Sequence, residues 1–121
     1  MDSSPLEGLW VVKFLANPPR SGQQSIGAGV VVFMKDRALG GDSQYYYDGQ
    51  VTVANDIVNA EISVRLHNRT FGGQSIFGTL ETFNLLLTGK LGDREVVLTG
   101  RLKEIPGEGI SIHCTKVKGL P

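Results

Sequence analysis

The 121-residue sequence lacks an excess of charge of either sign, because 12 Lys and Arg residues balance 12 Asp and Glu residues. Nucleic acids and anionic membrane surfaces normally require a basic protein surface. The balance therefore predicts that neither is the main partner. The sequence also lacks a run of about 18 apolar residues, the length that a transmembrane helix needs.

Cysteine is nearly missing too, since Cys114 is the only one. A single cysteine excludes an internal disulfide framework and is typical of a reducing compartment. The first residues, MDSSPLEGLW, lack the basic and apolar regions of a signal peptide. We therefore expect a cytoplasmic protein.

Residues for catalysis and metal binding are scarce. A nucleophile needs a base within reach, but the neighbours His113 and Cys114 should point to opposite sheet faces. His67 falls on the polar face of its segment, and a metal site needs several ligands that converge. Four aspartates lie in or beside predicted turns, where aspartate caps its own backbone: Asp36, Asp48, Asp56 and Asp93. We predict no enzymatic activity, no metal and no cofactor.

Two glycine motifs, GAG at 27–29 and GGD at 40–42, lack the following helix whose amides would hold a phosphate. Glycine within strands more often marks a bulge or a sharp bend. We interpret both motifs as bends, with Asp42 capping the second.

What the sequence does contain is period-two alternation, which is typical of half-buried strands. It is clearest over 57–67, where every second residue from Val58 to Leu66 is apolar. About eight such segments follow one another along the chain, most of them joined by short turns. The segment 68–83 has the length of a helix but contains three glycines, which leaves open only a short helical turn at 76–81.

This pattern predicts an all-β protein, either an eight-stranded antiparallel up-and-down barrel or a closely related sandwich. We expect a single domain over 1–121, with 1–6 as a flexible tail. An eight-stranded barrel is filled by side chains or holds one small ligand. The side chains that we assign to this interior, and to any apolar ligand in it, are Trp10, Val12, Phe14, Tyr45, Tyr47, Ile62, Val64, Leu66, Phe83, Leu85 and Cys114.

Two segments, GVVVFM at 29–34 and NLLLTG at 84–89, are apolar on both faces of the predicted strand. A strand of this kind is covered on both faces. The outer cover is either a second copy of the chain, in a homodimer, or the long loop around Phe71. Parity also places Tyr45 and Tyr47 on one face and Tyr46 on the other, and leaves open which face points inward.

The first 50 residues contain a set of spaced motifs: Gly8, Leu9, Trp10, Phe14, Asn17, Gly27, Ala28, Gly29, Gly40, Gly41, Asp42, Tyr47, Asp48 and Gly49. The opening GLW at 8–10 resembles that of lipocalin-like barrels. Together the motifs resemble one family, the GrlR-like proteins, which are small bacterial regulators of type III secretion gene expression. Later segments match that family only in pattern.

The resemblance implies a lipocalin-like, usually dimeric barrel with an apolar cavity, which regulates transcription by binding an activator protein rather than DNA. In that family an acidic cluster after the tyrosine strand engages the activator, whereas here 53–59 offers only Asp56. The first hypothesis is therefore a protein-binding, non-enzymatic regulator. The alternative is a small barrel that carries or senses an apolar ligand or lipid.

Overall fold

The computed structural model describes residues 6–17, 27–67, 82–104 and 109–119, and these residues form β-strands and turns but no helix. No described segment is therefore a helix that could cross a membrane. The eight strands are β1 (Gly8–Asn17), β2 (Gly27–Met34), β3 (Arg37–Gly41), β4 (Tyr45–Ala54), β5 (Ile57–Leu66), β6 (Thr82–Lys90), β7 (Glu95–Leu102) and β8 (Gly109–Lys118).

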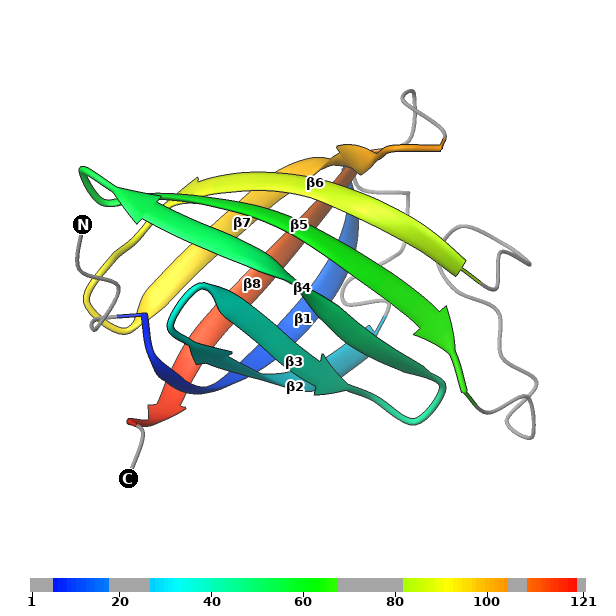
Figure 1. Ribbon diagram of the computed structural model, residues 1–121, viewed down its shortest axis with the longest axis horizontal. Helices are drawn as coiled ribbons and strands as arrows, with labels where there is room; N and C mark the ends of the chain where they lie inside the picture. The colour runs from blue at the N-terminus through cyan, green and yellow to red at the C-terminus, as the bar shows by residue number, and fades with distance from the viewer. Residues whose placement is uncertain (1–5, 18–26, 68–81, 105–108, 120–121) are drawn as a thin grey trace.

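Each strand pairs with its neighbours in sequence, and β1 pairs antiparallel with β8 to close the barrel (Figure 1). The predicted all-β, eight-stranded antiparallel up-and-down barrel is thus confirmed. Two predicted features, the helical turn at 76–81 and the loop around Phe71, lie outside the described residues.

Short turns set the register of the first hairpins. The β4–β5 hairpin has a two-residue loop, Asn55 and Asp56, whose φ angles of 53° and 65° are both left-handed. A type I′ turn requires this conformation at both positions, and its twist matches that of the flanking strands. The turn places Ala54 opposite Ile57 and so fixes the pairing along both strands.

The strands alternate between a buried and an exposed face, which places the core inside the barrel. On β5, Val58, Ala60, Ile62 and Val64 are buried, while the residues between them point outward. Buried positions of the described strands are apolar or aromatic, and tyrosine is the most polar type among them.

Two expectations about the chain were wrong. Asp48 lies within β4 rather than in a turn, and its carboxylate pairs with Arg37 on β3 at 3.1 Å. Leu6 was expected in a flexible tail, but its side chain is only 1% exposed and belongs to the core. The rest of that tail, residues 1–5, lies outside the described residues.

Candidate functional site

The residues that we assigned to the interior do lie there. Tyr45 and Tyr47 point inward and Tyr46 outward, which parity alone had left open. Phe14 and Leu66 are partly buried and pack against the core. The other nine are buried: Trp10, Val12, Tyr45, Tyr47, Ile62, Val64, Phe83, Leu85 and Cys114.

These side chains nearly fill the barrel. The cavity that remains in the barrel has a volume of about 40 Å³ and an apolar lining. Of the assigned residues, Trp10, Tyr45, Leu66 and Phe83 do not line it, and core residues that we did not assign complete the lining: Val31, Phe33, Ala38, Ala60, Leu87, Leu98 and Ile112. A drug-sized ligand needs a pocket of roughly 300–1,000 Å³. The described interior therefore has room for little more than one small atom group, and it offers no ready pocket for a lipid.

Trp10 anchors one end of this core. Its side chain is fully buried, and its indole N–H donates a hydrogen bond of 2.7 Å to the carbonyl oxygen of Leu6. Phe33 packs edge-to-face against the indole, with 5.8 Å between ring centroids. A buried indole needs a hydrogen-bond acceptor, so the Leu6 backbone is held against the barrel by the tryptophan.

Asp42 organises the corner between β3 and β4. One oxygen of its carboxylate accepts hydrogen bonds from the backbone N–H groups of Gln44 and Tyr45, at 2.8 and 2.7 Å. The other oxygen accepts a hydrogen bond from the Tyr47 hydroxyl. The predicted capping role of Asp42 is confirmed. Its bond to Tyr47 was not anticipated, because it depends on which face of β4 points inward.

The Tyr47 phenol is held protonated by its surroundings. Burial raises the pKa of Tyr47 far above its usual value, and the hydrogen bond to the nearby Asp42 carboxylate raises it further. Phe14 packs against the ring, with 5.5 Å between centroids. The pair therefore serves as a hydrogen-bonded anchor, since a phenol with so high a pKa does not act as a base.

Glycines of the two motifs allow the strands to approach closely at the β3–β4 corner, because a larger residue would add a Cβ there. A Cβ on Gly29 would lie 2.9 Å from the Tyr47 hydroxyl oxygen and 2.7 Å from the carbonyl oxygen of Gly41. A Cβ on Gly41 would lie 2.9 Å from the Tyr45 carbonyl oxygen. The two glycine motifs are close approaches of strands, and the bends that we assigned to them stay a prediction.

Three further motif glycines also mark close approaches. A Cβ on Gly40 would lie 2.1 Å from the Val30 carbonyl oxygen, and Gly8, with φ of 144°, adjoins the backbone of β8. A Cβ on Gly49 would lie 2.2 Å from the Glu61 carbonyl oxygen and 2.6 Å from the Ile62 side chain. Gly27 opens β2 opposite Phe14.

The histidines and the cysteine are separated in the barrel wall. His113 is exposed and Cys114 is buried, on opposite faces of β8. Burial raises the pKa of the Cys114 thiol to about 12, so the thiolate that a nucleophile needs is disfavoured. His67 Nε2 lies 3.0 Å from the carbonyl oxygen of Asp42, an acceptor, and donates to it. Within the described residues, no three His, Cys, Asp or Glu side chains gather as metal ligands would.

The outer surface of three neighbouring strands carries a continuous apolar patch, which we call the β1–β3 face. Val30, Met34 and Leu39 are 47%, 45% and 50% exposed. The strand registers align Leu9 with Val32 and Val32 with Leu39, and Val11 with Val30. The β1–β3 face consists of Leu9, Val11, Val30, Val32, Met34 and Leu39.

The segment 84–89, which we also expected to be apolar on its outer face, differs from the β1–β3 face. On β6 the outward residue Leu86 is half-buried and lies between Glu61 on β5 and Arg101 on β7. Polar residues thus surround one leucine there, and the apolar outer surface predicted for β6 is wrong. The segment 84–89 looked apolar because Leu85 and Leu87 are core residues.

The comparisons with known proteins assign no family. No protein-family model matches the chain, and no curated protein matches it significantly.

Proposed function

We propose that this protein is a non-enzymatic regulator that works by binding other proteins, first a second copy of itself and then a transcriptional activator. Its localisation in this proposal is cytoplasmic. The similarity of its first 50 residues to the GrlR-like regulators of type III secretion genes supports this function, as does its zero net charge. A neutral surface does not favour DNA as the partner.

The observation that carries the proposal is the β1–β3 face. Monomeric soluble proteins rarely leave a large contiguous apolar patch in water, and such patches mark sites of protein association. Here Val30, Met34 and Leu39, each close to half exposed, lie on adjacent strands. A homodimer that joins two such faces would bury them, because the same patch on both subunits is self-complementary in a twofold dimer.

The barrel interior favours the regulator over the ligand carrier. A cavity of about 40 Å³ is too small for a lipid or a drug-sized molecule. Binding on the outside of the barrel needs no interior space. The ligand carrier therefore has no specific observation in its favour among the described residues.

The contact with an activator would differ from that of the resembling family. The place of its acidic cluster is occupied here by the two-residue turn of Asn55 and Asp56. One carboxylate on so short a turn presents little negative charge to a partner. We therefore expect another surface of the dimer to engage the activator.

Sedimentation equilibrium tests the dimer. We expect the native chain to sediment as a dimer and Val30→Lys and Leu39→Lys as monomers, because each charge would be buried in the interface. Val97→Lys is the matched control, since Val97 is 45% exposed on β7, outside the β1–β3 face. A monomeric native chain, or equal dissociation of the Val97 variant, would contradict the dimer.

Transcript profiling of the native host tests the regulator. Deletion of the gene should raise a defined set of transcripts, and the native chain and Val97→Lys should both restore their repression. A tagged native chain should also co-purify with the activator of those genes. Unchanged transcripts after deletion would sink the regulatory proposal and leave the dimer measurement intact.

A further inference from the structure

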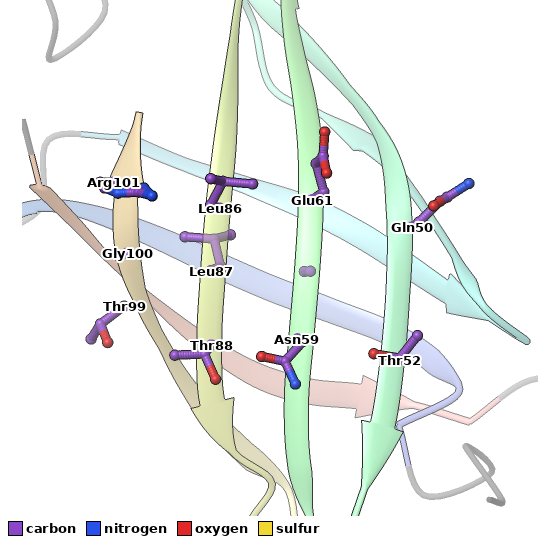
Figure 2. Close-up of a pocket in the computed structure, with 11 residues that line it drawn as sticks. Gln50, Thr52, Asn59, Glu61, Leu86, Leu87, Thr88, Thr99, Gly100 and Arg101 are labelled. Atoms are coloured by element: carbon purple, nitrogen blue, oxygen red, sulfur yellow. The ribbon is translucent and has the colours of Figure 1, made fainter. Parts of the chain in front are cut away.

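A wide groove runs over the outer surface of β4, β5, β6 and β7, with a volume of about 800 Å³ (Figure 2). In the closed order of strands, β4 adjoins β3, and β5, β6 and β7 follow it around the barrel, so none of the four belongs to the β1–β3 face. The groove is therefore separate from the surface that we assign to the dimer. Ala60 and Leu87 of its lining are buried core residues, and the polar and charged residues of the lining lie on the outer side of the strands.

One row of side chains crosses the groove at a right angle to the strands. Thr52 pairs with Asn59, Asn59 with Thr88, and Thr88 with Thr99. With strands about 4.8 Å apart, this row extends over about 14 Å. All four side chains are uncharged and carry hydrogen-bonding groups, and none bonds to another described residue.

The adjacent row gives the groove its floor and its ends. Gln50, Glu61, Leu86 and Arg101 follow one another across the same four strands. Leu86 is half-buried at the centre, and Figure 2 shows it between Glu61 and Arg101. Beside it Gly100 pairs with the core residue Leu87, and a Cβ there would lie 1.8 Å from the Leu86 carbonyl oxygen. The centre of the floor is thus apolar, and its surroundings are polar.

The charges of the groove nearly cancel. Glu61 pairs with Lys103 at 3.4 Å, and Arg101 is the remaining charged residue of the lining. A polyanion such as nucleic acid would need several cations in the groove. A lipid or an amphipathic helix would need a broad apolar stripe, whereas the floor has one leucine. A β-strand would need a free sheet edge, and the barrel closes all eight strands.

A neutral ligand rich in hydroxyl groups satisfies these features. Threonine hydroxyls and the Asn and Gln amides both donate and accept hydrogen bonds, as sugar hydroxyls do. Leu86 offers apolar surface to the C–H face of a sugar ring. We propose that the groove over β4–β7 binds a neutral, linear oligosaccharide, with the row Thr52, Asn59, Thr88 and Thr99 bonding its hydroxyls and Arg101 at one end.

Titration of the ¹⁵N-labelled full chain with linear oligosaccharides of glucose, xylose, mannose and N-acetylglucosamine tests this by amide shift mapping. At least one of them should give saturable shifts centred on Thr52, Asn59, Thr88 and Thr99. Thr88→Val and Thr99→Val should each weaken that binding about two- to tenfold, the loss expected for one hydrogen bond to an uncharged group.

Thr115→Val is the matched control, because Thr115 is an exposed threonine on the outer face of β8, outside the groove. It should leave the affinity unchanged. The proposal is overturned if none of the four sugars gives saturable shifts, if the shifts lie elsewhere, or if Thr115→Val weakens binding as much as Thr88→Val. Tighter binding of an oligogalacturonate would also overturn it, since that would make the groove an anion site. The dimer measurement is independent of every one of these outcomes.

Discussion

The carboxylate of Asp42 has two structural tasks at the β3–β4 corner. It accepts hydrogen bonds from the backbone N–H groups of Gln44 and Tyr45 where the chain turns. It also accepts the hydroxyl of Tyr47, whose ring is buried in the core. The corner and the core are therefore coupled through one side chain.

Removing either partner should lower the stability of the barrel. Asp42→Ala removes three hydrogen bonds to a carboxylate and leaves the buried Tyr47 hydroxyl without its acceptor. We expect it to lower the free energy of unfolding by about 2–3 kcal/mol, and Tyr47→Phe by about 1–2 kcal/mol. Urea unfolding followed by tryptophan fluorescence measures both, because Trp10 is the only tryptophan and is buried.

Tyr46→Phe is the control for the loss of a hydroxyl, since Tyr46 is 45% exposed. It should change the free energy of unfolding by less than about 0.5 kcal/mol. The double variant of Asp42 and Tyr47 should cost less than the sum of the two single changes, because they share a bond. Strict additivity would show that the two side chains are energetically independent.

For single residues, the sequence could predict those structural roles that depend only on the neighbouring residues in the chain. The Asp42 cap follows from an aspartate beside two glycines at a bend, and period two put Tyr45 and Tyr47 together. The bond between Asp42 and Tyr47 could not be predicted, because parity does not reveal which face of a strand is inside. The neighbours of Gly49 likewise depend on β5, which pairs with β4 through a register that no local pattern near Gly49 specifies.

At the scale of the strands, the turn between β4 and β5 fixes the register of that hairpin. Its loop residues Asn55 and Asp56 both have left-handed φ angles. Asparagine and glycine adopt that conformation at low cost, and Asn-Gly is the preferred pair for this turn. Aspartate at the second position is tolerated, but a side chain without a local hydrogen-bonding group is strained there.

Substitutions at Asp56 therefore test the turn. Asp56→Gly should leave the hairpin more stable than Asp56→Ala by about 1 kcal/mol, because only glycine takes the left-handed region without a steric penalty. Urea midpoints of the two variants measure this difference. The same pair of changes at Asp93, which has no positive φ, should give no such preference for glycine; a preference of equal size there would contradict the assignment to backbone conformation.

The same hairpin shows how far strand pairing could be predicted. A two-residue loop dictates that Thr52 faces Asn59, so half of the groove row follows from the sequence once the turn is recognised. The pairing of Asn59 with Thr88 could not be predicted, because β5 and β6 are 15 residues apart in the sequence and a connection of that length does not reveal the register. The groove could therefore not be predicted from the sequence, because its residues come from two hairpins, β4–β5 and β6–β7, that are joined by a long connection.

At the scale of the whole molecule, the barrel separates three environments. The interior is apolar and nearly filled, the β1–β3 face is apolar and exposed, and the groove over β4–β7 is polar. Alternation along the strands predicted the apolar interior and left open whether it is filled. The two outer surfaces differ because neighbouring strands contribute like residues, which depends on the order of strands around the barrel. A closed barrel can therefore present unlike surfaces to two partners at once.

The filled interior also makes the whole barrel sensitive to alkaline pH. Burial raises the pKa of Cys114 from 9.0 to about 12 and raises that of Tyr47 above its ordinary 10.0. The folded chain therefore keeps both protons at a pH where the unfolded chain releases them. Stability is full below about pH 9. Above that pH it falls by about 1.4 kcal/mol per pH unit because of Cys114, and above about pH 10 Tyr47 adds an equal slope.

Urea unfolding at several values between pH 8 and pH 11 measures this slope. Cys114→Ala should lower the free energy of unfolding at every pH, because it removes core packing. Above pH 9, however, its free energy of unfolding should fall less steeply than that of the native chain, since the contribution of the Cys114 proton is gone. Tyr47→Phe should flatten the curve only above pH 10, because the unfolded phenol titrates there. Curves for the two variants that run parallel to that of the native chain would show that neither buried group supplies the alkaline sensitivity. The slope for Cys114→Ala should depart from the native slope at a lower pH than the slope for Tyr47→Phe does. That order identifies the buried thiol and the buried phenol as the two groups responsible.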